Sequence, residues 1–172
     1  MDMEDIRRRW GAWVRTMPLT IPVDIERVCA ALGAQRGRVF VLEPTLHLPV
    51  GTTGRWLATA TADIIQYDAR LTGRHRLQVI FHEIGHPVCG HEPTAEESEL
   101  ALLRTLDKLT PAAIRHINGR YRGRHPEHPD EIEAEGFSAL VLEEIDRRSG
   151  SVAYGEDDPG LRGYSSFLFF GA

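Results

Sequence analysis

A short motif near the middle of the chain combines the residue types best suited to chemistry. His82, Glu83 and His86 fit the pattern H-E-x-x-H. On a helix, residues four apart share a face, so the two imidazoles can converge on one metal ion at about 2 Å from each nitrogen. Glu83 lies on the flank, where its carboxylate can take a proton from water whose pKa zinc has lowered. The motif therefore predicts a zinc site with Glu83 as general base.

A third protein ligand is required, because two histidines alone bind zinc weakly. The extended pattern H-E-x-x-H-x-x-G-x-x-H fails, since Cys89 and Glu92 stand where the glycine and the last histidine would be. Cys89 would also crowd the same helix edge as His86, and we expect it to be a small buried residue. Glu131 is the stronger candidate, because it begins a separate downstream helix and can approach the site from another direction.

Two more glutamates on that downstream helix are weaker candidates for a role at the metal. Glu135 lies one turn beyond Glu131 on the same face, where its carboxylate can hydrogen-bond the free nitrogen of a ligand histidine. Glu133 points away from that pair and is the weaker rival for the metal. The alternative for all three is that they solvate the start of a helix, where negative charge is favourable.

The surrounding pattern predicts the elements that position these residues. Helical periodicity and capping residues predict helices over 3–16, 24–33, 94–108, 111–118 and 131–148, and one more that contains the motif. β-Branched and aromatic residues predict strands over 38–42, 55–59 and 62–67. The order is mixed, with helices dominating the second half, so the predicted fold class is α+β.

Particular residues are expected to begin and end these elements. Asp24 and Asp130 are the expected helix N-caps, Gly33 the expected helix stop and Pro44 the expected strand stop. Thr94 and Glu97 predict a capping box, and Pro111 is expected in the first turn of its helix. Pro87 removes a helical hydrogen bond and disfavours helical geometry at the preceding residue, so the motif helix should kink or end there. Residues 119–130 read as a loop. We expect the basic residues Arg115, Arg120, Arg122 and Arg124 to be solvated rather than to grip an acidic substrate.

Composition limits the classes of function. The chain has 172 residues, 42% of them hydrophobic, which predicts a single domain over 1–172. Its core should cover about 20–148, with helix 3–16 and tail 149–172 as appendages. The net charge of −5 argues against direct nucleic-acid binding, and no apolar run is long enough for a membrane span. Cys29 and Cys89 are too few for a disulfide framework, which favours the cytoplasm.

With these residues together, the sequence resembles the ImmA/IrrE-type metallopeptidases over residues 20–145. The similar segments are 22–33, 62–67, 76–86 and Glu131-x-x-Ala134-x-x-Phe137. The resemblance implies a compact, zincin-like core of gluzincin type, with the motif helix under a small curved antiparallel or mixed sheet. It implies one zinc ion per chain, held by His82, His86 and Glu131 with Glu83 catalytic. A peptide substrate would add as a strand at the edge formed by 56–61.

The expected function is that of a zinc-dependent endopeptidase that hydrolyses a peptide bond in a specific protein or peptide. A transcriptional regulator is the favoured substrate by family analogy alone. The alternative is a non-proteolytic regulatory or toxin–antitoxin-type interaction protein that retains the zinc site. The sequence leaves the oxyanion-stabilising group open among Tyr67, Tyr121, Tyr154, His91 and His116, and it leaves the oligomeric state open as well.

Overall fold

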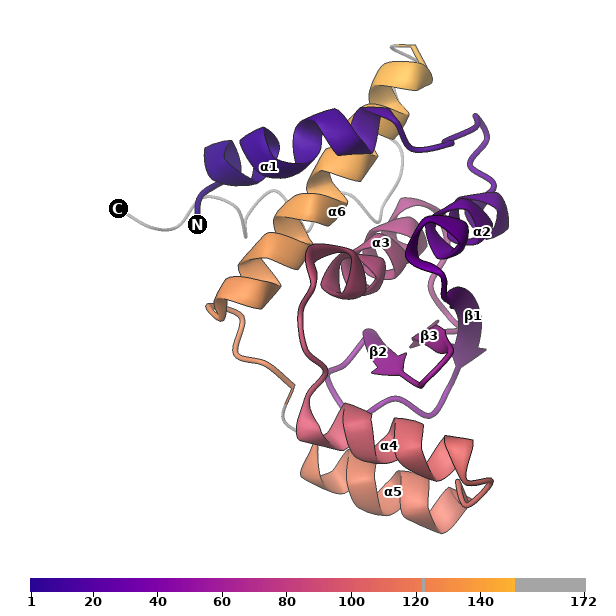
Figure 1. Cartoon of the computed structure of the whole chain (residues 1–172). Helices are drawn as coiled ribbons and strands as arrows, with labels where there is room; N and C mark the ends of the chain where they lie inside the picture. The colour runs from indigo at the N-terminus through magenta and orange to yellow at the C-terminus, as the bar shows by residue number, and fades with distance from the viewer. Residues whose placement is uncertain (122, 151–172) are drawn as a thin grey trace.

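A computed structural model describes residues 1–121 and 123–150 as six helices and a three-stranded sheet (Figure 1). The fold class is α+β, as predicted. The elements are α1 (Met3–Arg15), α2 (Ile25–Arg36), β1 (Val39–Thr45), β2 (Gly54–Ala58), β3 (Ala62–Asp68), α3 (Gly73–Cys89), α4 (Ala95–Thr105), α5 (Pro111–Arg120) and α6 (Pro129–Arg148). The tail from 151 onward and Arg122 lie outside the described residues, and so does the candidate Tyr154.

The sheet is mixed and forms the middle layer of the molecule. Its strand order is β1-β3-β2, with β1 parallel and β2 antiparallel to β3. Trp56 and Ile65 pair across the strands and pack into the main hydrophobic cluster, with α2, α3 and α6. Their neighbours Leu57 and Ile64 face the other way and pack against α4 and α5. Because side chains alternate between the two faces of a strand, both faces are covered.

Helix α3 lies between the sheet and α6, and α1 packs across the outer side of α6 (Figure 1). Small residues allow α3 and α6 to approach closely. A Cβ built on Gly85 would lie 3.3 Å from the Cα of Ala134 and 3.1 Å from the ring of Phe137. On the opposite side of α6, a Cβ on Gly136 would collide with Ile6 of α1. The motif helix is therefore fixed between two packed layers.

The prediction that Gly33 ends the second helix is wrong. α2 continues to Arg36, and Gly37 ends it with a left-handed φ of 65°. Gly33 is instead a packing residue: a Cβ there would lie 2.5 Å from the carbonyl oxygen of Arg38, where the chain turns back into β1. The absence of a side chain at this position lets β1 begin directly after the helix.

The predicted stop at Pro44 and the predicted cap at Asp130 are also wrong. Pro44 lies within β1, which is an edge strand, and a proline is tolerated there because only one side of the strand needs hydrogen bonds. α6 begins two residues before the predicted start, with Pro129 in its first turn and His128 as N-cap. The side chain of His128 accepts a hydrogen bond from the backbone N–H of Asp130.

Other local predictions are confirmed. Asp24 caps α2, and Thr94 and Glu97 form a reciprocal capping box at the start of α4. Pro111 occupies the first turn of α5.

The motif helix does not end at Pro87. α3 continues through this proline and ends two residues later, at Cys89. Within residues 1–121 and 123–150, the structure contains no helix long and apolar enough to cross a membrane.

The packing of Gly33 gives a stability prediction. We expect Gly33→Ala to lower the free energy of unfolding by about 1–3 kcal/mol, because the added methyl group has to displace backbone. Gly119→Ala is the matched control: it also lies in a helix, but a Cβ there would meet no atom within 4 Å. That control should gain about 0.5–1 kcal/mol from helix propensity. Chemical denaturation of both variants measures the difference, and equal changes in the two would contradict this account of Gly33.

Candidate metal centre

The structure brings the two motif histidines and Glu131 together where α3 and α6 meet. His82 Nε2 lies 3.1 Å from Glu131 Oε2, and His86 Nε2 lies 3.5 Å from Glu131 Oε1. One ligand atom from each of the three residues falls within 4.8 Å of the others. The close contact between Gly85 and Ala134 accounts for this, because it holds the first turn of α6 against the last turns of α3.

The two imidazoles are held at different depths. His86 is 3% exposed, and its ring lies parallel to that of Trp56 of β2, with centroids 6.4 Å apart. His82 is nearer the surface, and its ring is close to perpendicular to that of His86 at a centroid distance of 5.0 Å. The nitrogens thus approach Glu131 from different directions, as ligands around a single ion must.

Glu135 lies where the sequence predicts, one turn along α6 from Glu131. Its Oε2 is 3.3 Å from His82 Nδ1, so one histidine contacts a carboxylate through each ring nitrogen. Burial opposes protonation of His82, but the hydrogen bonds to Glu131 and Glu135 prevail and raise its pKa to about 10. Burial, together with the charge of His82, lowers the pKa of His86 to about 2. A metal ion bound to His82 would have to compete with this proton.

The donor set fits zinc. Two imidazole nitrogens and one carboxylate oxygen are a ligand combination of catalytic zinc sites, in which a fourth position stays open for water or substrate. Calcium and magnesium instead prefer oxygen ligands throughout. His82, His86 and Glu131 are therefore the residues that would hold a zinc ion in this chain, and that assignment stays a prediction.

The side chain of Glu83, on α3, is buried against β2. It is 8% exposed, and a Cβ on Gly54 of β2 would lie 2.7 Å from its Oε1. Burial raises the pKa of Glu83 to about 8; the charge of His82 opposes this, while that of Glu97 reinforces it. A carboxyl with a pKa near neutrality can both accept and return a proton at physiological pH.

The structure describes four of the five candidates for oxyanion stabilisation. The hydroxyl of Tyr121 donates a hydrogen bond of 2.9 Å to Glu97 Oε1, and burial raises the pKa of Tyr121. His116 is exposed on α5, and Tyr67 is half-buried at the end of β3. His91 contacts His86 through its Nδ1. Tyr121 is thus tied to the network around Glu97 rather than exposed to solvent.

Arg124 is a site residue that the sequence reasoning missed. Its side chain is 11% exposed, with Nη1 3.7 Å from Glu131 Oε1 and Nε 3.7 Å from Asp130 Oδ2, and it also donates to the carbonyl of Glu92. The expectation of a solvated basic loop is wrong for this residue, whereas Arg115 and Arg120 are exposed. No local signal distinguishes Arg124, because its burial depends on the return of the loop to α6.

The turn after α3 brings His86 and His91 into contact, which the sequence analysis did not predict. Gly90, with φ of 85°, reverses the chain so that the His91 N–H donates to the carbonyl of His86. This hydrogen-bond pattern places the side chains of His86 and His91 together. A glycine directly after the motif helix was the available signal, since such a glycine predicts this turn.

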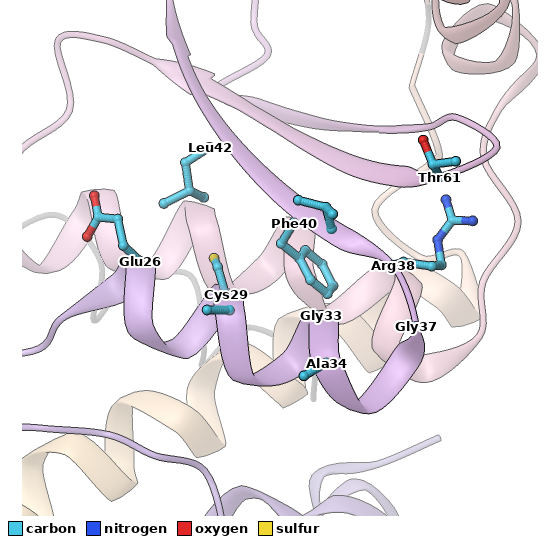
Figure 2. Close-up of a pocket in the computed structure, with 11 residues that line it drawn as sticks. Glu26, Cys29, Gly33, Ala34, Gly37, Arg38, Phe40, Leu42 and Thr61 are labelled. Carbon is cyan, nitrogen blue, oxygen red and sulfur yellow. The ribbon is translucent and has the colours of Figure 1, made fainter.

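A hollow of about 710 Å³ lies elsewhere, between α2 and β1 (Figure 2). Its lining is mainly small or apolar and includes Cys29, Phe40 and Leu42, with Glu26 and Arg38 at its ends. None of the three clustered ligand residues lines it. The convergence of chemical groups, rather than the size of a cavity, therefore identifies the candidate centre.

Compared with known protein families, curated proteins and solved structures, the chain has no match. The resemblance to the ImmA/IrrE-type metallopeptidases stays an expectation from the sequence motifs.

Metal binding can be tested directly. We expect the purified chain to bind one zinc ion, and Glu131→Ala to bind zinc at least about 100-fold more weakly, because losing a ligand costs more than losing a group that only hydrogen-bonds one. Elemental mass spectrometry and competition with a chromophoric chelator give stoichiometry and affinity. Glu127→Ala, an 89% exposed glutamate just before α6, is the control and should match the wild type. Undiminished affinity in Glu131→Ala would remove Glu131 from the ligand set.

Proposed function

We propose that this chain is a zinc-dependent endopeptidase that hydrolyses a peptide bond in a specific protein or peptide. His82, His86 and Glu131 would hold the metal, and Glu83 would act as general base. The observation that carries the proposal is a convergent nitrogen–nitrogen–oxygen ligand set beside a buried carboxylate of raised pKa on the same helix. That combination matches water-driven hydrolysis, in which a metal ion and a general base act on the same water.

A zincin-like core of the ImmA/IrrE type is part of this proposal. α3 carries the motif beneath a small mixed sheet, and α6 brings the third candidate ligand from another direction. β2 pairs only with β3 among the described strands, and the proposal assigns its other edge to an added peptide strand. Residues 54–57 are buried and Ala58 is half-buried, so a peptide would first meet this edge near Ala58. Gly54 in β2 touches Glu83, which brings that edge close to the proposed base.

The chemistry follows from the positions of the side chains. When bound, zinc would act as a Lewis acid toward the scissile carbonyl and lower the pKa of water. The Glu83 carboxylate would take the proton as water attacks the carbonyl carbon and would then deliver it to the leaving amine nitrogen.

Location in the cytoplasm belongs to the same proposal. Both cysteines of the chain are buried and unpaired. Burial raises the pKa of the Cys29 thiol to about 12, which keeps it protonated and unreactive. Free thiols of this kind are typical of proteins in a reducing compartment.

The role of Glu83 can be separated from metal binding. We expect Glu83→Gln to retain its zinc but to cleave peptides at least about 100-fold more slowly, because the amide keeps the shape and loses the base. Incubation with a proteome-derived peptide library, read by mass spectrometry for new termini, measures cleavage. Glu92→Gln, an exposed glutamate, serves as the control. A zinc-loaded wild type that cleaves nothing, or no more than Glu83→Gln, would favour the non-proteolytic interaction protein.

The contact of Gly54 with Glu83 gives an independent prediction. Gly54→Ala places a methyl group 2.7 Å from Oε1 of Glu83 and should displace that carboxylate. Cleavage should fall by at least about tenfold while zinc stoichiometry stays unchanged, because misplacement of a base by a fraction of an ångström is costly. Ala58→Gly, at the other end of β2, controls for altered strand propensity. Full activity in Gly54→Ala would show that Glu83 does not need its present position.

A further inference from the structure

We propose that His91 and Glu133 are positioning residues that form a hydrogen-bond relay with His86 and fix its ring so that Nε2 presents a lone pair to the metal position. The proposal rests on the proposed function, because it assigns His86 as a metal ligand. Neither His91 nor Glu133 belongs to the H-E-x-x-H motif.

The relay is continuous from α3 to α6. His86 Nδ1 lies 3.0 Å from His91 Nδ1, and His91 Nε2 lies 3.2 Å from Glu133 Oε2. The other oxygen of Glu133 receives Trp10 Nε1 at 2.7 Å and Arg9 Nη1 at 3.0 Å, both from α1. Asp130 Oδ1, the remaining carboxylate oxygen near His91, lies 4.0 Å away and beyond hydrogen-bonding distance.

The direction of each hydrogen bond follows from what the groups can donate. Trp10 and Arg9 can only donate, so Glu133 accepts from both. Glu133 therefore acts as an acceptor toward His91 as well, and His91 Nε2 carries the hydrogen. The relay assigns the hydrogen of the 3.0 Å contact to His86 Nδ1, with His91 Nδ1 as its acceptor. A His91 that carried hydrogen on both ring nitrogens would reverse this contact, and the tautomer spectra described below distinguish the two arrangements. His86 Nε2 is left bare, 3.5 Å from Glu131 Oε1.

Burial makes the relay effective. The side chains of His86, His91 and Glu133 are 3%, 5% and 6% exposed, so water cannot readily replace a lost partner. A buried hydrogen bond that is lost leaves a polar atom unsatisfied, which favours the arrangement that keeps the contacts between His86, His91 and Glu133. The turn at Gly90 holds the backbone of His91 against His86 independently of the side chains.

A different arrangement competes for the same residues. Cys89, His91 and Glu133 also offer ligand atoms within 4.8 Å of one another and could hold a second metal ion. One observation favours the relay. Glu133 already contacts Trp10, Arg9 and His91, so a metal ion bound to its carboxylate would have to displace at least one of these contacts. The relay uses every observed contact without displacing any of them.

The tautomers of His86 and His91 can be determined by long-range ¹H–¹⁵N correlation spectra of ¹⁵N-labelled, metal-free protein near neutral pH. The relay requires hydrogen on His86 Nδ1 and His91 Nε2, and bare His86 Nε2 and His91 Nδ1. In His91→Phe, His86 should lose this single tautomer and show the averaged shifts of a mixture. A hydrogen on His86 Nε2 in the wild type would overturn the relay, whatever the zinc affinity.

Zinc affinity, measured by chelator competition, is the second readout. We expect His91→Phe to bind zinc about 10–100-fold more weakly than the wild type. His91→Asn keeps an acceptor near His86 Nδ1 and should recover part of that loss. His116→Phe, at an exposed histidine of α5, is the matched control. Circular dichroism confirms that each variant is folded.

The outcomes separate this proposal from the proposed function. A wild type that binds zinc while His91→Phe binds it equally well contradicts the relay alone. A wild type that binds no zinc contradicts the proposed function, and the tautomer spectra still decide whether the relay exists. Two zinc ions in the wild type and one in Cys89→Ala would make His91 and Glu133 ligands of the second ion, and the relay would be wrong.

Discussion

The close approach of α3 and α6 is the constraint on which the rest of the site depends. Gly85 has no side chain, and Ala134 has a small one, so the two helices meet where a larger residue on either would separate them. The motif histidines flank Gly85 on α3, and Glu131 lies one turn before Ala134 on α6. A ligand set from two helices requires this contact, because a carboxylate side chain cannot span a wider gap. The same packing buries Phe137 against α3, so one contact serves both the core and the site.

The sheet fixes the other side of the motif helix. Trp56 of β2 lies parallel to the ring of His86, and Gly54 of the same strand touches Glu83. One strand therefore confines both a proposed ligand and the proposed base. This explains why β2 begins with a glycine even though glycine weakens strands. It also explains why two polar side chains of α3, Glu83 and His86, are buried: α3 is covered by β2 on one side and by α6 on the other.

Sequence patterns predict what depends on neighbours along the chain. The Thr94–Glu97 capping box, the cap at Asp24 and the separate helix that carries Glu131 all follow from local spacing. The predictions at Gly33 and Arg124 failed because tertiary contacts determine those positions. The sequence predicts Gly33 as a helix stop, but its lack of a side chain leaves room for the carbonyl of Arg38. The sequence predicts Arg124 as a solvated loop residue, but the fold places it beside Glu131. Residue type identifies the groups capable of chemistry, but only the packing of helices shows which of them meet.

The N-terminal helix α1 contacts both the hydrophobic core and the residues of the proposed relay. Ile6 and Val14 of α1 belong to the main hydrophobic cluster, so α1 is packed into the core. Its polar face is engaged as well, since Trp10 and Arg9 both reach Glu133, which in turn contacts His91. A buried carboxylate without such donors would be costly, and an apolar residue at position 133 would avoid that cost. The contacts with Trp10 and Arg9 offset that cost and link α1 to α6. The proposed relay gives the glutamate a further role, because it needs an acceptor at this point that is held rigidly, and the donors of α1 hold it.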